Sequence, residues 1–386
     1  MLNAGECKHN VDFDERPFIA IWEATQACDL ACVHCRASAQ PLRSALELST
    51  AEARRLIDEI AEMKVPVFVI TGGDPLKRPD LFDLVEYATA RGVRTSLTPS
   101  ATPLLTRQAI AELQCRGLAR LAVSLDGSTA EIHDAFRRVP GSYAWTLRAI
   151  RWARELGLPV QINTTVTRRN LTDFEKMARL LETLDIAMWS VFFLVPTGRG
   201  QQNDLISAEE FEGVFAKLHR VAQHASFDIK TTEAQHYRRY VLQQRTAQRK
   251  HEREESGSGR AETTHGAGNS APHENFTDGI GRAPRGLNDA KGFVFISHLG
   301  EVFPSGFLPI SAGNVRRQPL AEIYRHSPLF VSLRDTSRLQ GKCGVCEFRN
   351  VCGGSRARAY ALTGDPLGEE PCCVYQPKVV AETVAG

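Results

Sequence analysis

From residue 18 to about 223 the chain alternates short apolar runs with longer segments in which apolar residues recur at helical spacing. Six of the runs are short and rich in β-branched or aromatic residues, which is typical of buried strands. They cover residues 18–23, 65–70, 94–97, 120–125, 160–166 and 189–195. Alternation of strands with helices favours a parallel sheet with right-handed crossovers, and therefore an α/β fold.

Two of the intervening helices have clear start signals. Ser49 is followed three residues later by Glu52, and Ser207 by Glu210, which is the pattern of a capping box. After the first of these, apolar residues recur every three or four positions, as expected for one buried helix face.

The pattern fades past residue 226, and we divide the chain there. Residues 1–16 are predicted to be an N-terminal tail, 17–226 the α/β unit, 227–287 a linker, and 288–380 a small α+β domain. Within the linker, residues 243–272 are charged and then rich in Gly and Ser, which predicts a disordered insert. Residues 291–297 and 300–304 predict a β-hairpin with Gly300 near its turn.

Composition narrows the class of protein. The chain has 386 residues, 42% hydrophobic and 24% charged, with a formal net charge of +2. This weak charge argues against a protein that binds nucleic acid through phosphate neutralisation. We find neither a signal peptide in the polar start nor a run of about eighteen apolar residues, so we expect a cytoplasmic protein without a membrane span. In that compartment clustered thiols indicate metal ligands.

Three of the ten cysteines, Cys28, Cys32 and Cys35, follow the first predicted strand with spacing Cys-x3-Cys-x2-Cys. Protein-held iron–sulfur cubes normally take four thiolates, so three on one loop suggest that another ligand completes the shell. A structural zinc site is an alternative, but such a site requires four ligands. A disulfide would leave one thiol over, and free core cysteines are the remaining alternative.

This spacing resembles the signature of the radical S-adenosylmethionine (SAM) superfamily. The resemblance implies a partial (β/α)6 TIM-like barrel, with a [4Fe–4S] cluster held by the three cysteines and by SAM on the fourth iron. A flavodoxin- or ferredoxin-type donor would supply an electron, and reductive cleavage of SAM would give a 5′-deoxyadenosyl radical that abstracts a substrate hydrogen. No residue is required as acid or base, so the catalytic residues are unknown.

The same resemblance suggests SAM contacts at the carboxyl ends of strands, where sites of such barrels gather. Gly72, Gly73, Asp74 and Pro75 look like the family's Gly-Gly-Glu motif in an Asp-Pro form, although Gly-Gly-Asp-Pro is also an ordinary turn. The remaining candidates are His34, Ser124, Asp126, Asn163 and Arg199. Asp126 is equally explained by an Asp-Gly turn, and Asn163 by a backbone partner.

The late cysteines are similar to the SPASM or twitch extension of radical SAM enzymes, which implies an auxiliary [4Fe–4S] cluster. Its expected ligands are Cys343, Cys346, Cys352 and Cys373, with Cys372 as the alternative to Cys373. A two-cluster extension would have cysteines near Ser305 and Ser355, so one auxiliary cluster is expected. A four-cysteine zinc site is the alternative.

The tail after Cys352 is similar to the haem-biosynthesis subgroup, which implies a tetrapyrrole substrate. Arginines that could face its propionates are Arg199, Arg282, Arg285, Arg356 and Arg358, although surface charge explains them equally. A peptide-modifying maturase is the alternative, disfavoured because few residues precede the first strand. A non-catalytic iron–sulfur carrier would not need the loop at Gly72.

Overall fold

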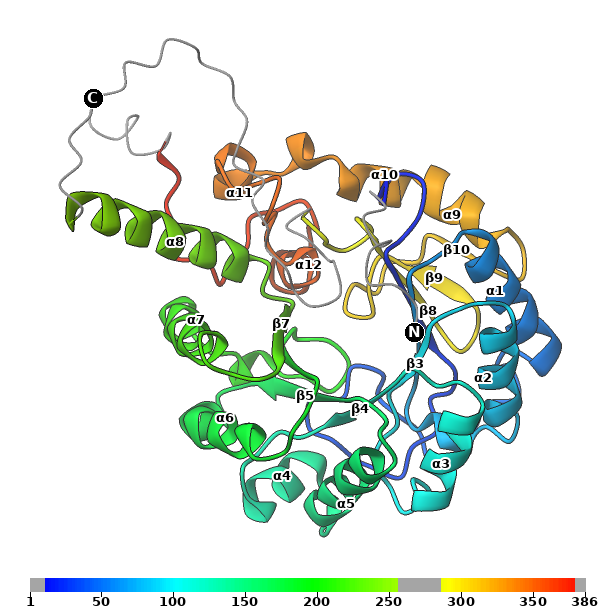
Figure 1. Ribbon diagram of the computed structural model, residues 1–386. Helices are drawn as coiled ribbons and strands as arrows, with labels where there is room; N and C mark the ends of the chain where they lie inside the picture. The colour runs from blue at the N-terminus through cyan, green and yellow to red at the C-terminus, as the bar shows by residue number, and fades with distance from the viewer. Residues whose placement is uncertain (1–10, 256–285, 379–386) are drawn as a thin grey trace.

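The computed structural model describes residues 11–255 and 286–378, and these residues build one curled sheet surrounded by helices (Figure 1). The strand order is β10-β9-β8-β1-β2-β3-β4-β5-β6-β7. Neighbours from β8 through β1 to β7 pair in parallel, whereas β9 and β10 pair antiparallel. The predicted α/β class is confirmed.

The strands have the following bounds: β1 Ile19–Glu23, β2 Val67–Thr71, β3 Thr95–Leu97, β4 Arg120–Ser124, β5 Val160–Val166, β6 Met188–Phe193, β7 Asp228–Thr232, β8 Phe293–Ile296, β9 Glu301–Phe303 and β10 Gly313–Asn314. The six strands predicted from the apolar runs are thus present, with ends shifted by a few residues. The predicted hairpin is β8–β9, and Gly300 in its turn has a φ of +83°.

The helices have the following bounds: α1 Thr50–Glu62, α2 Leu81–Ala90, α3 Arg107–Cys115, α4 Ala130–Arg137, α5 Ser142–Glu155, α6 Phe174–Glu182, α7 Ala208–Ala222, α8 His236–Glu255, α9 Leu320–His326, α10 Pro328–Arg334, α11 Gly341–Val345 and α12 Arg356–Thr363. Short 3₁₀ turns cover Pro75–Lys77, Leu171–Asp173, Gln202–Asp204 and Thr336–Arg338. Both predicted capping boxes form, at the starts of α1 and α7.

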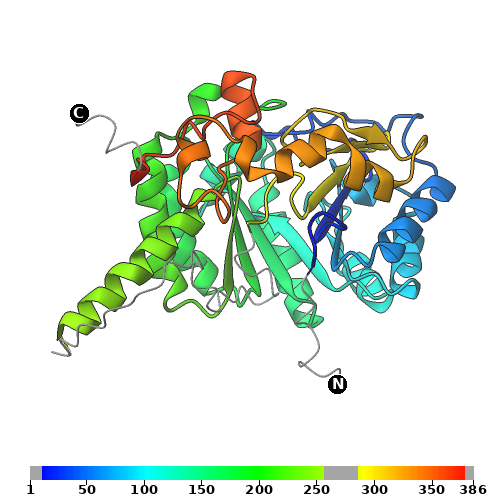
Figure 2. The same ribbon diagram turned by 90° about the horizontal axis from the view of Figure 1, so that it is seen from above.

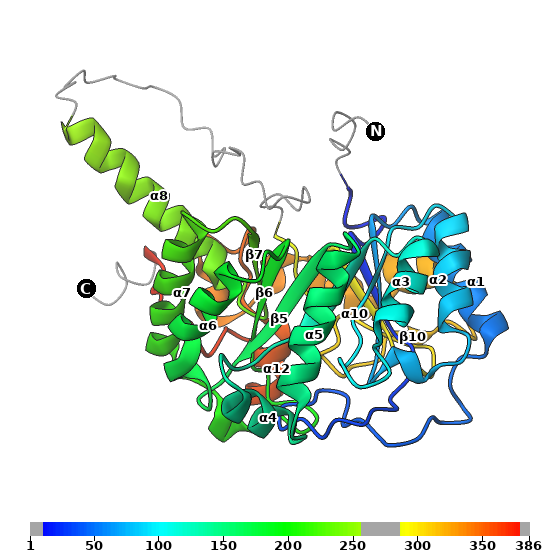
Figure 3. The ribbon, with the colours of Figure 1, turned by 60° about the horizontal axis from the view of Figure 1, so that its bottom comes forward.

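Helices α1 to α7 lie around the outer face of the sheet (Figures 1 and 3). Each buries an apolar face against the strands: α1, for example, buries Leu56, Ile57 and Ile60. The sheet curls so far that side chains from β7 and β8, near its two ends, line the same central cavity. The result is the expected partial barrel with a hollow bore, and the carboxyl ends of its strands open on one side.

The region from residue 227 onward differs from the prediction in three ways. β7 is a seventh parallel strand inside the predicted linker, and it pairs with β6. Residues 243–255 continue α8, a helix that projects from the body (Figure 2), so the predicted disordered insert is wrong for them. The rest of that insert, 256–272, lies outside the described residues.

The third difference concerns the C-terminal region. It does not build a separate sheet, because β8 pairs in parallel with β1 from Ile19↔Phe293 to Trp22↔Ile296. Helices α9 to α12 then cover the side of the barrel that α1 to α7 leave open (Figure 1). Within the described residues no helix is both long enough and apolar enough to cross a membrane.

Candidate functional site

The three early cysteines lie together on the loop that leaves β1. Cys28 and Cys32 are buried in one small apolar cluster, and Cys35 packs against it. Each sulfur accepts a hydrogen bond: Cys28 from the Leu30 amide (3.3 Å), Cys35 from the Ala39 amide (3.4 Å) and Cys32 from Arg137 Nη1 (3.5 Å). N–H donors at sulfur are what iron–sulfur thiolates use, since they stabilise negative charge on the ligand.

The glycines after β2 hold this cysteine loop in place. A Cβ on Gly72 would stand 2.4 Å from the Thr25 carbonyl oxygen, and one on Gly73 would stand 2.4 Å from the Ala27 oxygen. The Gly73 amide donates to the Thr25 carbonyl at 2.7 Å and the Asp74 amide to the Ala27 carbonyl at 2.6 Å. Only glycine permits this contact, so the motif positions the backbone just ahead of Cys28.

Asp74 and Pro75 fix the same turn from inside the protein. Asp74 is fully buried and caps the 3₁₀ turn that Pro75 begins, accepting from the Leu76 amide at 3.2 Å through Oδ1. Its Oδ2 accepts from Thr102 Oγ1 at 2.7 Å. Burial raises the pKa of Asp74, although these donors oppose the rise. Both carboxylate oxygens therefore already have donors inside the fold.

Asp126, which follows β4, also binds donors inside the fold. It is buried in an ion pair with Arg137, and its Oδ1 accepts from the Thr165 amide at 2.7 Å. Because Arg137 also donates to Cys32, the carboxylate holds the donor of a cluster cysteine. Burial raises the pKa of Asp126 against the opposing charge of Arg137.

Ser124 and Asn163 are paired neighbours on β4 and β5, and both are half-buried. Asn163 accepts a hydrogen bond from Gln161 Nε2 at 2.7 Å and lines the central cavity. Of these two residues, Asn163 is the one that lines the cavity, where a bound ligand would reach it.

Arg199, after β6, reaches back to the cysteine loop. Its amide donates to the Cys35 carbonyl at 2.9 Å and its Nε to the Cys32 carbonyl at 3.0 Å. Nη2 of Arg199 is buried without a partner. A cationic nitrogen with unused donors beside the cluster loop suits a carboxylate ligand. Gly198 has a φ of +59° and a Cβ there would lie 2.2 Å from the Arg36 carbonyl oxygen, so the turn requires glycine.

His34 lies within the cysteine loop, with its ring 4.5 Å from that of Phe136 between centroids. Its Nδ1 is buried without a hydrogen-bond partner. Burial, with Arg137 and Arg199 nearby, holds the pKa of His34 well below its usual value, so the ring is neutral.

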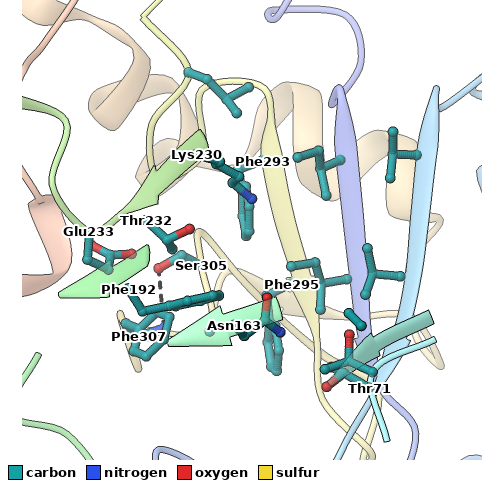
Figure 4. Close-up of a pocket in the computed structure, with 18 of the residues that line it drawn as sticks. Thr71, Asn163, Phe192, Lys230, Thr232, Glu233, Phe293, Phe295, Ser305 and Phe307 are labelled. Atoms are coloured by element: carbon teal, nitrogen blue, oxygen red, sulfur yellow. Dashed lines mark hydrogen bonds between the residues drawn. The ribbon is translucent and has the colours of Figure 1, made fainter. Parts of the chain in front are cut away.

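The barrel bore holds a cavity of about 230 Å³. Four phenylalanines contribute to its wall, Phe192, Phe293, Phe295 and Phe307. In Figure 4, Phe293 and Lys230 lie at one end, and Thr71, Asn163 and Phe307 at the other. Cationic side chains also line the cavity: Arg36, Arg94, Arg120, Lys230 and Arg238. The lining thus combines aromatic faces with positive charge.

Arg36 on this wall, and His298 behind it, were not predicted. Arg36 forms an ion pair with buried Glu23 and lies 4.5 Å over the Phe295 ring. His298 Nδ1 lies 3.0 Å from the other Glu23 oxygen. The position of Arg36 directly after Cys35 was the only available signal, because its partners come from distant segments.

Glu233 and Asp289 form a buried acidic pair that also lines this cavity. Glu233 has a φ of +57°, rare for a residue with a side chain, and it accepts from Ser355 Oγ at 2.5 Å. Asp289 accepts from the Ala357 amide at 2.9 Å. Burial raises the pKa of Glu233 to about 8, with a further contribution from Asp289. Nothing in the local sequence predicts that these carboxyl groups meet.

The late cysteines gather in a second, smaller pocket. Cys343, Cys346, Cys352 and Cys373 all line it, whereas Cys372 does not and packs in the main apolar core. Backbone amides donate to two of the lining sulfurs, Glu370 to Cys343 at 3.3 Å and Gly354 to Cys352 at 3.4 Å, and the backbone of Phe348 and Tyr375 lies within hydrogen-bonding range of Cys346 and Cys373. Among the described residues we find no such donor to the Cys372 sulfur, so the geometry favours Cys373 over Cys372.

The two arginines near this pocket, Arg356 and Arg358, bind other groups of the protein. Arg358 is 0% exposed and pairs with Glu370 at 3.0 Å, and Arg356 is 1% exposed and donates to the Pro366 and Gly368 carbonyls. Neither lines the central cavity, so we no longer assign them to a substrate. Arg282 and Arg285 lie outside the described residues.

Comparison with known proteins decides the family. The family model described as "Radical SAM superfamily" matches residues 22–181 of the chain. An "AdoMet-dependent heme synthase" from Methanosarcina barkeri is 41% identical over 361 residues, covering 94% of this chain and 97% of the relative. The chain belongs to the radical SAM superfamily.

A more distant relative is a "PqqA peptide cyclase" from Rhodopseudomonas palustris, 30% identical over 94% of this chain and 88% of the relative. Among solved structures, Streptococcus suis SuiB bound to S-adenosylmethionine superposes with a TM-score of 0.69 at 14% identity, covering 94% of this chain and 78% of that one. At that identity the likeness supports the fold alone.

As a radical SAM enzyme the protein binds a [4Fe–4S] cluster and SAM. The cysteine loop fits the cluster, since it offers three gathered thiols with N–H donors, and the orphaned Nη2 of Arg199 fits a carboxylate ligand beside it. In the described parts of the chain no three His, Cys, Asp or Glu side chains are arranged around a single metal ion. A cube binds each cysteine through a different iron, so this observation does not test it.

Proposed function

We propose that this radical SAM enzyme acts on an iron-bound tetrapyrrole, removing or remodelling its propionate side chains as a haem synthase. The observation that carries the proposal is similarity at 41% identity, over nearly the whole of both chains, to a relative named "AdoMet-dependent heme synthase". The named peptide cyclase is only 30% identical.

The cavity supports a flat, anionic substrate. Phe192, Phe293, Phe295 and Phe307 offer aromatic surfaces against which a macrocycle can stack. The cationic side chains of the lining suit carboxylates. Arg36 is the best placed of them because it directly follows Cys35 and is held by Glu23.

We propose that Cys28, Cys32 and Cys35 hold the first cluster. When bound with SAM, this cluster supplies the 5′-deoxyadenosyl radical that abstracts the substrate hydrogen. Gly72, Gly73, Asp74 and Pro75 fix the backbone ahead of Cys28, and Asp126 acts through Arg137 on Cys32. Asn163 and Arg199 are proposed to contact SAM directly, and His34 and Ser124 to line its site.

We further propose that Cys343, Cys346, Cys352 and Cys373 hold an auxiliary [4Fe–4S] cluster. The four thiols line one pocket with a backbone amide near each of them, which supports four-thiolate ligation. With all four ligands from the protein, such a cluster would transfer electrons to or from the substrate radical. A flavodoxin- or ferredoxin-type protein in the cytoplasm is the proposed external donor.

The test is turnover by anaerobically reconstituted protein with SAM, a reductant and an iron tetrapyrrole that carries propionates. We expect 5′-deoxyadenosine to form together with a tetrapyrrole that has lost a propionate carboxyl group, detected by mass spectrometry. The control omits SAM. Modification of a short precursor peptide, with the tetrapyrrole unchanged, would overturn the assignment in favour of a peptide maturase.

A further inference from the structure

The first turn of α8 presents two buried side chains to the auxiliary pocket. His236 and Arg239 line this pocket together with the four cysteines, and they are 0% and 4% exposed. They are three residues apart on one helix, so they lie on the same face.

Both side chains have buried nitrogen atoms without a hydrogen-bond partner. Neither ring nitrogen of His236 has a well-aligned partner, and neither has Nε of Arg239. The other guanidinium nitrogens of Arg239 are used, because they pair with Glu212 and donate to Gln243. Buried N–H groups without acceptors are rare in folded proteins, so something that the protein alone does not supply is expected to accept them.

The acceptors that fit are the sulfur atoms of a cluster in this pocket. Arg239 interacts electrostatically with Cys352 and Cys373, which places its charge next to two of the proposed ligands. The His236 ring packs against the rings of Phe211 and Phe215, at centroid-to-centroid distances of 5.2 and 4.8 Å, so its orientation is already fixed. A neutral imidazole offers one N–H and a guanidinium always offers its Nε–H.

We propose that His236 and Arg239 donate N–H hydrogen bonds to sulfur atoms of the auxiliary [4Fe–4S] cluster and raise its reduction potential. The inference rests on the auxiliary cluster proposed above. Reduction adds negative charge to the cluster, and N–H donors stabilise that charge, so removing a donor lowers the potential. The start of α8 is then part of the auxiliary site rather than a linker.

The backbone of Cys372 also lies within hydrogen-bonding range of the His236 ring. A hydrogen bond to it would orient the ring without reaching the cluster. In that arrangement the reduction potential of the auxiliary cluster would not change when the imidazole is removed. The reduction potential is therefore the measurement that separates the two arrangements.

The experiment uses the full chain with Cys28, Cys32 and Cys35 all changed to Ala, so that only the auxiliary cluster remains. Iron and labile sulfide are measured first, and about four irons are expected for one cube. Their absence would overturn the auxiliary cluster itself, before any potential is measured. EPR-monitored redox titration then gives the midpoint potential.

In this background His236→Phe and Arg239→Met are each expected to keep their iron and to shift the midpoint to a more negative potential. His219→Phe, on α7 outside the pocket, is expected to leave it unchanged. Unchanged midpoints in both test variants, with iron retained, would overturn the proposal.

If His236→Phe loses iron, His236→Gln is used next, because it removes the ring but keeps an N–H donor. Restored loading with a midpoint near that of the parent protein supports donation to the cluster. If loading stays lost, the aromatic packing of the ring is its role, and the proposal fails for His236.

Discussion

At the scale of single residues, several polar side chains around the cysteine loop are turned toward the protein. Asp74 and Asp126 are predicted to contact SAM, and in the structure both bind donors of the fold that hold the cluster loop. A sequence places an acid at the end of a strand, but whether it faces the ligand or the neighbouring loop depends on residues far away, such as Thr102 or Arg137.

Asp126→Ala tests this structural role. The substitution leaves Arg137 buried without its partner, so we expect the free energy of unfolding to fall by about 3–5 kcal/mol. Anaerobic urea unfolding measures it, with Asp83→Ala, an exposed carboxylate on α2, as a control expected to change little. Unchanged stability together with weakened SAM binding would instead show a direct ligand contact.

Cys372 and Cys373 provide a second residue-scale test. Cys373 lines the pocket with the Tyr375 backbone within hydrogen-bonding range, whereas Cys372 packs in the core. We expect Cys373→Ala to reduce the reconstituted iron content from about eight to about four per chain and Cys372→Ala to retain about eight. Iron and sulfide analysis checks this, and the reverse result would exchange the two assignments.

Glu233 gives a prediction for pH. Burial raises its pKa from 4.5 to about 8; Asp289 and Glu370 add to the rise, while Ser355 and Arg358 oppose it. Between these values the folded state binds more protons than the unfolded state, so stability falls as pH rises. Relative to the parent protein, Glu233→Gln should therefore gain at least about 1.4 kcal/mol, the equivalent of one pKa unit, between pH 5 and pH 8.

Urea midpoints at the two pH values measure this gain, with the exposed Glu322→Gln as the control. Parallel pH dependences of Glu233→Gln and the parent protein would show that Glu233 is ionised in the folded state.

At the scale of elements, the sequence predicts those whose signal is local. The apolar runs of β1 to β6 and the capping boxes at Ser49 and Ser207 are all present. β7 was missed because every residue from Asp228 to Thr232 is half-buried, which removes the alternation that marks a strand. The pairing of β8 with β1 joins segments more than 270 residues apart and has no local signature.

α8 shows the opposite error. Its charged sequence from residue 243 onward predicted disorder, since little of it can be buried, yet residues 243–255 continue a helix whose first turn is anchored by His236 and Arg239 and whose far end projects outward (Figure 2). Composition averaged over a segment hides two residues that hold one end of it.

The contact between the loop after β2 and the cysteine loop gives an element-scale prediction. Gly73→Ala would place a Cβ 2.4 Å from the Ala27 carbonyl oxygen, so one loop must move. We expect reconstituted iron to fall toward about four per chain, because only the first cluster depends on this loop. Gly213→Ala in α7, where a Cβ meets nothing within 4 Å, is the matched control and should load normally. Full loading of Gly73→Ala would contradict the positioning role.

At the scale of the whole molecule, the two cysteine sites belong to one continuous structure. β8 joins the C-terminal region to β1, immediately before the cysteine loop. Arg358 ties α12 to the barrel through the carbonyl oxygens of Leu194 and Glu233. The two sites nevertheless use different loops and different donors to sulfur, so each is expected to load without the other.

This independence predicts two distinct losses of activity. Cys32→Ala removes a ligand of the first cluster and should abolish formation of 5′-deoxyadenosine. Cys352→Ala removes a ligand of the auxiliary cluster and should leave reductive cleavage of SAM within about threefold of the parent protein while product formation is lost, because the cysteine loop and its donors are untouched. Chromatography of 5′-deoxyadenosine and of the tetrapyrrole from the same reaction separates the two effects. If Cys352→Ala also abolished SAM cleavage with about four irons still bound, the first cluster would depend on the auxiliary site, and the connection through β8 and Arg358 would have to carry that dependence.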